Sequence, residues 1–169
     1  MKNKWIIQIF IISFILSAIF SGFSSFLSDI NVIVLVVIIF IVIGIGLLFD
    51  MIGVAALTAE EAPFHAMSSK KVKEATACIN LLKNSTKVSS ICNDIVGDIC
   101  GIVSGGLGAT LAVYLTTELG MNALLASVLV ASFISALTVG GKAYFKTVAM
   151  KKSDKIVLAV GKIMQVFQK

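Results

Sequence analysis

The residues of this sequence that could do chemistry are carboxylates inside an apolar stretch. Residues 88–115 have the length and apolarity of a membrane-spanning helix, yet Asp94 and Asp98 lie within them. On a helix, residues four apart share one face, so the two carboxylates are expected side by side. A charged carboxylate near the middle of a bilayer costs about 2.5–3.5 kcal/mol, so the pair needs protons, partners or a bound cation. Asn93, which precedes Asp94, is expected to join the same site.

Two more ionisable residues are expected at a similar depth on other helices. Asp50 lies in the apolar run of residues 32–58, and Lys142 lies near the end of the apolar run 123–149. A helix rises about 1.5 Å per residue, which puts the three aspartates roughly 9–15 Å below one membrane surface. Four ionisable groups from three helices therefore indicate a polar cluster between helices.

This cluster has two interpretations. Carboxylate, amide and carbonyl oxygens suit hard cations, so the first is a Mg²⁺ or Na⁺ site whose candidate ligands are Asp50, Asn93, Asp94 and Asp98. The second is structural: the carboxylates and Lys142 pair with one another and fix the register of the helices. Lys142 would also neutralise a nearby site, which argues against a divalent cation there.

Composition places the chain among membrane proteins. Of its 169 residues 58% are hydrophobic and 14% are charged, and the mean hydropathy is +1.03. Soluble domains are about 45–50% apolar and about 25% charged. The sequence carries no nucleophile–base arrangement and no nucleic-acid signature. We therefore expect an integral membrane protein that is not an enzyme and has no organic cofactor.

The elements that must position the polar residues are all helical. We expect an all-α integral membrane protein with about four transmembrane helices, the first at residues 5–27 and the others at 32–58, 88–115 and 123–149. The polar segment 60–87 predicts one or two juxtamembrane amphipathic helices, and residues 151–169 predict an amphipathic C-terminal surface helix. Residues 1–30 would then be an extra N-terminal transmembrane helix, added to a membrane domain of residues 31–169.

Lysine positions predict the orientation. All 14 basic residues are lysines, and they lie at the N-terminus, in segment 60–87, at the end of the last span or in the C-terminal tail. The two predicted loops on the other side of the membrane contain no lysine, and their only charged residues are Asp29 and Glu118. Because cytoplasmic loops are enriched in Lys and Arg, we expect a multi-pass cell-membrane protein with both termini cytosolic.

A stripe of small residues follows the first carboxylate. Asn93, Gly97, Gly101 and Gly105 recur every four residues and so lie on one helical face. Small residues let helix backbones approach closely in membranes, so this stripe predicts close packing against another helix.

Four stretches of the chain carry a family resemblance. They are Ala55-Ala56-Leu57-Thr58-Ala59, Leu81-Leu82-Lys83-Asn84, Ser89-Ser90-Ile91-Cys92-Asn93-Asp94 and Gly141-Lys142-Ala143-Tyr144-Phe145-Lys146-Thr147-Val148-Ala149. In this order they resemble the transmembrane domain of the cyclin M / CorC (CNNM-type) magnesium transporter family. There a span ends in S-E-x-A-L-T, a juxtamembrane helix pair ends in L-L-x-N, the next span carries G-N, and the last ends in G-E-x-x-P-K-x-x-A.

The resemblance implies a homodimer with three core spans, a juxtamembrane helical belt and a cytosol-facing cavity for Mg²⁺. The nucleotide-binding CBS modules that usually follow this domain are not expected here. Asn93 and Lys146 match motif positions, whereas Gly53 stands where the family has Ser, Lys142 where it has Glu, and Phe145 where it has Pro. The family's magnesium site is therefore not simply carried over.

The sequence supports two functions of different classes. The first is a cation transport or binding protein for Mg²⁺ or Na⁺, using Asp94, Asp98, Asn93 and Asp50. The alternative is a non-transporting membrane scaffold or regulatory subunit with an internal Asp/Lys network. Membrane lipids surround either one, a separate cytosolic or membrane partner is possible in both, and nucleic acid is not expected.

Overall fold

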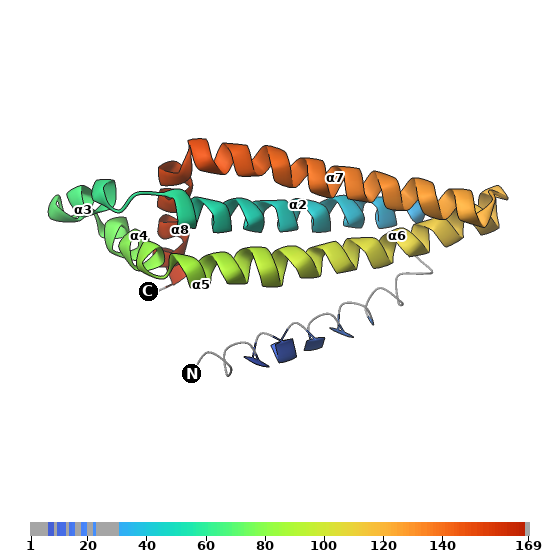
Figure 1. Cartoon of the computed structure of the whole chain (residues 1–169), viewed down its shortest axis with the longest axis horizontal. Helices are drawn as coiled ribbons and strands as arrows, with labels where there is room; N and C mark the ends of the chain where they lie inside the picture. Colours follow the sequence, from blue (N-terminus) through green and yellow to red (C-terminus); the bar gives the residue numbers. More distant parts are fainter. Residues whose placement is uncertain are drawn as a thin grey trace. The chain divides into compact units, whose positions relative to one another are not determined.

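The computed structural model of the chain describes residues 31–167 and, before them, residues 7, 8, 10–12, 14, 15, 18, 19 and 22 (Figure 1). All the regular secondary structure of the described part is helical, as predicted. Its elements are α2 (Val32–Thr58), α3 (Ala62–Ser69), α4 (Lys73–Lys83), α5 (Ser85–Ser89), the π-helix η1 (Ser90–Gly97), α6 (Asp98–Leu119), α7 (Ala123–Lys151) and α8 (Ser153–Phe167). The predicted first span, residues 5–27, falls largely outside the described residues.

Three helical segments are long and apolar enough to cross a membrane, which makes this a multi-pass membrane protein by length and composition. They are α2, the continuous segment Ser85–Leu119 formed by α5, η1 and α6, and α7. The predicted ranges 32–58 and 123–149 agree with α2 and α7 to within two residues. The middle span is longer at both ends than the predicted 88–115, since the helix includes polar residues that hydropathy alone leaves out.

The turn between α6 and α7 is specified by two residues. Gly120 ends α6 with φ of +62°, a left-handed conformation that glycine adopts without steric cost. Asn122 then begins α7: its side-chain oxygen accepts a hydrogen bond from the backbone N–H of Leu124 at 3.0 Å. The chain can therefore reverse within three residues.

The described chain divides into two compact units. The first contains the described residues up to Leu47 together with Ile95–Gly141, and the second contains Leu48–Asp94 and Lys142 onward. In the first unit α6 packs on α7 where Gly108 faces Ile134, and a Cβ on Gly108 would collide with the Ile134 side chain. Phe40 of α2 meets Phe133 of α7 edge to face, with ring centroids 6.5 Å apart.

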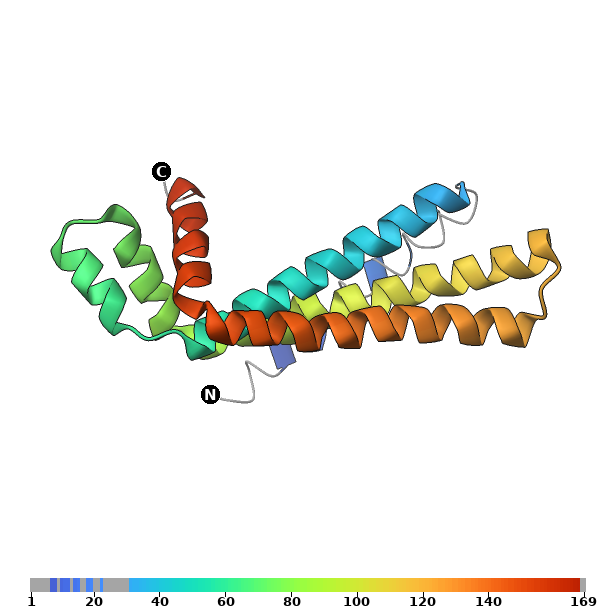
Figure 2. The same ribbon diagram turned by 90° about the horizontal axis from the view of Figure 1, so that it is seen from above.

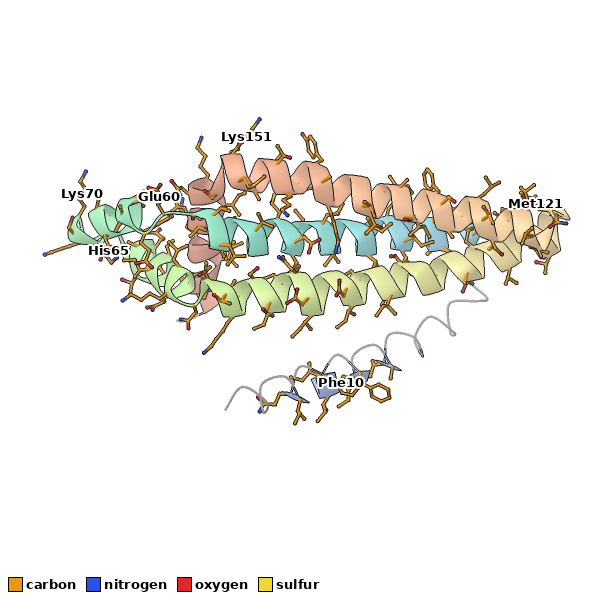
Figure 3. The ribbon with its side chains drawn as sticks, viewed as in Figure 1. Phe10, Glu60, His65, Lys70, Met121 and Lys151 are labelled. Carbon is orange, nitrogen blue, oxygen red and sulfur yellow. The ribbon has the colours of Figure 1, made fainter. Side chains whose placement is uncertain are left out.

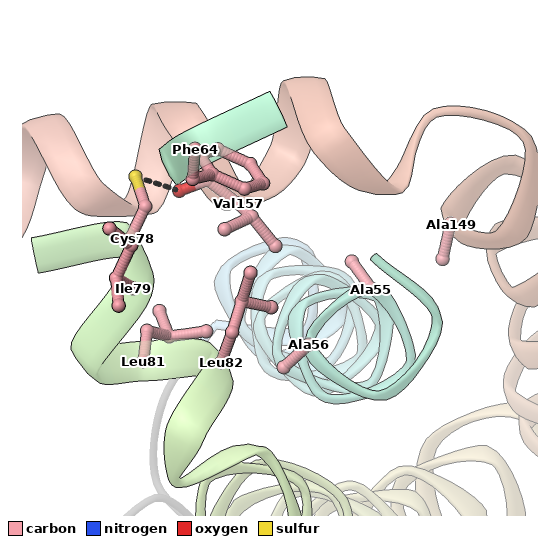
Figure 4. Close-up of a cluster of buried hydrophobic side chains, with 9 residues drawn as sticks. All are labelled: Ala55, Ala56, Phe64, Cys78, Ile79, Leu81, Leu82, Ala149 and Val157. Atoms are coloured by element: carbon pink, nitrogen blue, oxygen red, sulfur yellow. Dashed lines mark hydrogen bonds between the residues drawn. The ribbon is translucent and has the colours of Figure 1, made fainter. Parts of the chain in front are cut away.

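The second unit has its own apolar core, drawn in Figure 4. Its buried members come from α2, α3, α4, α7 and α8: Ala55, Ala56, Phe64, Cys78, Ile79, Leu81, Leu82, Ala149 and Val157. Five of them lie in segment 60–87, whose helices α3 and α4 therefore each bury apolar side chains. That these helices are juxtamembrane stays a prediction.

Helix α8 packs with its apolar face against α4. Figure 2 shows α8 turning away from the end of α7, and the chain bends at Lys152. Val157 is fully buried there, and the Cys78 thiol donates to its carbonyl oxygen at 3.6 Å. A Cβ on Gly161 would collide with Cys78 Sγ. The predicted C-terminal segment is therefore helical at Ser153–Phe167, and its apolar side is covered by protein at Val157, while Ile163 stays 59% exposed. Its place on the membrane surface stays a prediction.

Candidate functional site

An ion pair joins two spans near the ends that lead into α3 and α8. Lys142 Nζ of α7 lies 2.9 Å from Asp50 Oδ2 of α2. The Asp50 side chain is 14% exposed and that of Lys142 is 36% exposed. Asp50 is eight residues before the end of α2 and Lys142 is nine before the end of α7, so both sit about 12–14 Å along their helices from those ends.

This pair brings together two of the four ionisable residues that the sequence analysis expected in one cluster. A lone carboxylate or ammonium inside a bilayer is costly, whereas a pair in contact is neutral as a whole. The geometry therefore accounts for Asp50 without a bound cation. It is the only salt bridge between different helices among the residues that the structure describes.

A second polar group lies against the same face of α2. Asn93 Nδ2 donates to Ser89 Oγ at 3.2 Å, while Asn93 Oδ1 is buried and has no hydrogen-bond partner within the described part of the chain. The oxygen packs directly against Gly53, where any Cβ would collide with it. Gly53 follows Asp50 by three residues and so lies on nearly the same helical face. Asp50, Lys142, Asn93 and Gly53 form what we call the polar cluster.

Asn93 lies in the middle of η1, whose backbone hydrogen bonds follow the π pattern. Single π turns inside α-helices are rare, and they occur often at functional sites. Ser89, the partner of Asn93, was missed by the sequence analysis. Its spacing of four residues before Asn93 in one helix was the signal available for it.

The other carboxylates are placed differently. Asp94 and Asp98 are both exposed on the surface of the described chain. Asp94 falls in the second compact unit and Asp98 in the first. Neither makes a salt bridge within the described residues. The sites predicted at Asp94 and Asp98 therefore remain predictions.

The predicted small-residue stripe divides into two parts. A Cβ on Gly46 of α2 would lie 2.9 Å from the Cys100 Cβ and 3.8 Å from the Gly97 carbonyl oxygen, so α2 approaches this part of the span closely. At Gly101 and Gly105, by contrast, a Cβ would meet nothing within 4 Å.

Lys146, which matches a motif position of the family resemblance, is exposed on α7, one turn after Lys142.

No group of three or more His, Cys, Asp or Glu side chains in the described ranges is arranged to hold a metal ion. The polar cluster offers one carboxylate, which is paired, and one amide oxygen, which is not. What it can do chemically is hold a neutral ion pair between two spans and present a single desolvated acceptor.

Fold and site together define a multi-pass α-helical membrane protein with a charge pair between two of its spans. Comparison of the chain with protein-family models, with curated proteins and with solved structures finds no match. The resemblance to the cyclin M / CorC family therefore stays a prediction from short motifs.

Proposed function

We propose that this chain is a non-transporting membrane protein, a scaffold or regulatory subunit, whose charges within the spans pair with each other. The observation that carries the proposal is the 2.9 Å contact between Lys142 and Asp50. A tethered ammonium supplies the positive charge that a bound cation would otherwise bring. Since Lys142 is part of the polypeptide, the compensation is permanent, and no ion has to enter or leave.

The experiment is a double-mutant cycle on this pair. Asp50→Asn and Lys142→Met each leave one charge in the membrane without its partner, which costs about 1–3 kcal/mol or more. Removing both charges together is expected to restore most of the lost stability. Melting temperatures of the purified variants measure this, with a coupling of at least about 1 kcal/mol expected.

Ion flux separates this function from transport. Liposomes containing the wild-type protein are expected to show no Mg²⁺ or Na⁺ flux above that of empty liposomes. A wild-type flux above that of empty liposomes would contradict the proposal, whatever the double-mutant cycle gives.

The second candidate function is that of the cyclin M / CorC type, the binding or transport of Mg²⁺ or Na⁺. One observation favours it: Asn93 Oδ1 is a buried oxygen without a partner in the described chain, and it lies in a π turn. In this alternative Asp94 and Asp98 supply the charge. Asp94→Asn or Asp98→Asn should then abolish flux, and Mg²⁺ or Na⁺ should raise the melting temperature of the wild type by mass action.

Both proposed functions imply the same location and orientation in the membrane. The protein would lie in the cell membrane with α3, α4 and α8 in the cytosol, because these helices and the adjoining span ends carry nearly all the lysines that the structure describes. The family resemblance adds a homodimer to this proposal. We propose no enzymatic activity.

A further inference from the structure

An apolar groove runs along α6 and α7 on a face that no described residue covers. The two helices come together toward their common turn (Figures 1 and 2), and the groove between them has a volume of about 680 Å³. Its walls are built mainly from small side chains. They include Gly105, Ala109 and Ala112 of α6, and Ser127, Ala131 and Ser135 of α7.

The hydroxyl groups that line this groove are mostly satisfied within their own helices. Ser127 Oγ donates to the Ala123 carbonyl at 2.7 Å, and Thr138 Oγ1 donates to the Ile134 carbonyl at 2.8 Å. These hydroxyl groups therefore need no hydrogen bond from a molecule that binds in the groove. The groove is therefore suited to a closely packed helix with small side chains rather than to a polar ligand.

The chain itself contains an apolar segment that needs a place beside these spans. Residues 5–27 are apolar over a length that can cross the membrane. The described apolar side chains within them are exposed; they are Ile7, Phe10, Ile11, Ile12, Phe14, Ile15 and Ile19. Only residues 28–31 separate this segment from α2, a link that reaches at most about 14 Å. The beginning of α2 belongs to the same compact unit as the groove.

The segment also carries small residues at the spacing of the groove. Ser13, Ser17, Ser21 and Ser25 recur every four residues, so on a helix they form one stripe. On α7 the groove residues Ser127, Ala131, Ser135 and Val139 have the same spacing. Successive spans run in opposite directions, so as a span before α2 residues 5–27 would run opposite to both α2 and α7. Counted from the membrane surface where α2 begins, Ser25 would then lie within about 3 Å of the depth of Ser127, and Ser17 within about 3 Å of that of Ser135.

We propose that residues 5–27 of this chain dock as a helix into the groove between α6 and α7, with the serine stripe facing the small residues of α7. Small residues on both helices allow the backbones to approach closely, which is the main source of helix association in membranes. The docked segment covers the groove and its own serine face at once. It becomes a part of the membrane domain that closes the α6–α7 face to other partners.

Disulfide cross-linking in native membranes tests the docking. The full chain is made with its three native cysteines replaced by alanine, and a protease site is inserted at the α3–α4 turn after Lys70. In the variant Ser17→Cys/Ser135→Cys, oxidation should join the two fragments of one chain, so that cleaved protein still migrates at full length. The control Ile15→Cys/Ser135→Cys lies at the same depth but on the opposite face of the segment, and should cross-link at least ten-fold less.

Two outcomes overturn the proposal. A product of twice the chain mass means that a second copy occupies the groove. Equal or absent cross-linking in both pairs means that the segment lies elsewhere and that lipid fills the groove.

A variant that fills the groove controls for effects of the introduced cysteines on folding. Gly105→Leu fills the groove without meeting any atom of the described chain at its Cβ, and should reduce the Ser17–Ser135 cross-link several-fold. Gly140→Leu is the matched control, because its Cβ also meets nothing within 4 Å and it does not line the groove. Equal cross-linking in the two leucine variants, both eluting like the parent protein, would also overturn the proposal.

Discussion

At Asn93 the side-chain amide is satisfied on one side only. Its nitrogen donates to Ser89, and its oxygen is buried against Gly53 without a partner among the described residues. A buried acceptor without a hydrogen bond costs about 1–3 kcal/mol, so the position is not optimised for stability. Glycine at position 53 is what lets the asparagine oxygen come so close to α2.

A substitution at this contact should therefore be costly. Gly53→Ala places a Cβ against Asn93 Oδ1, and the shift that this forces should destabilise the protein by about 1–3 kcal/mol. Gly44→Ala is the control in the same helix: its Cβ meets nothing within 4 Å, and alanine in a helix is favoured over glycine by up to about 1 kcal/mol. Thermal unfolding in detergent compares the two. A Gly53→Ala variant as stable as Gly44→Ala would mean that Asn93 adjusts without strain.

Among the elements, α4 and α8 hold the second unit together through one close approach. Gly161 lies against Cys78, whose thiol donates to the carbonyl of Val157. Burial of Cys78 raises the pKa of its thiol above the ordinary value, since the thiolate would lose its hydration. The thiol therefore stays protonated near neutral pH. Its contribution to stability is present below pH 9 and is lost as the pH rises through the raised pKa.

The α4–α8 contact predicts a non-additive pair of substitutions. Gly161→Ala brings a Cβ into collision with Cys78 Sγ and should cost about 1–3 kcal/mol. With Cys78→Ala the sulfur is gone, and the remaining neighbours of that Cβ lie at 3.5 Å, an ordinary contact. The double variant should therefore lose less stability than the sum of the single variants, by at least about 0.5 kcal/mol in chemical or thermal unfolding. Additive losses would show that the helices move apart instead.

The sequence predicts some of these elements and contacts and not others. Residues 32–58 and 123–149 are identified as spans because hydropathy and helical length depend only on local composition. The π-helix at Ser90–Gly97 is not identified from the sequence, because the register of backbone hydrogen bonds leaves no hydropathy signal. For the same reason the orientation of Asn93 was open. The Asp50–Lys142 contact was one of two interpretations that charge alone allowed, and choosing between them needed the distance between side chains.

At the scale of the whole molecule, the lysines bear on the orientation in the membrane. Lys70 lies at the turn between α3 and α4, and Lys151 at the end of α7, while Met121 lies in the turn between α6 and α7 (Figure 3). One apolar segment, Ser85–Leu119, separates the first turn from Met121, and α7 separates Met121 from Lys151. If both segments span, Lys70 and Lys151 face one compartment and Met121 faces the other.

The expected orientation is with Met121 outside, because cytoplasmic loops retain lysine and the turn that contains Met121 has none. Cysteine labelling tests it in a chain whose native cysteines are replaced by alanine. A membrane-impermeant maleimide applied to intact cells should label Met121→Cys and leave Lys70→Cys and Lys151→Cys unlabelled until the membrane is permeabilised. Labelling of Lys70→Cys in intact cells with Met121→Cys protected would invert the topology. Labelling of all three would show that the segment Ser85–Leu119 or α7 does not cross, because two turns joined by a spanning helix cannot both be exposed on one side of the membrane.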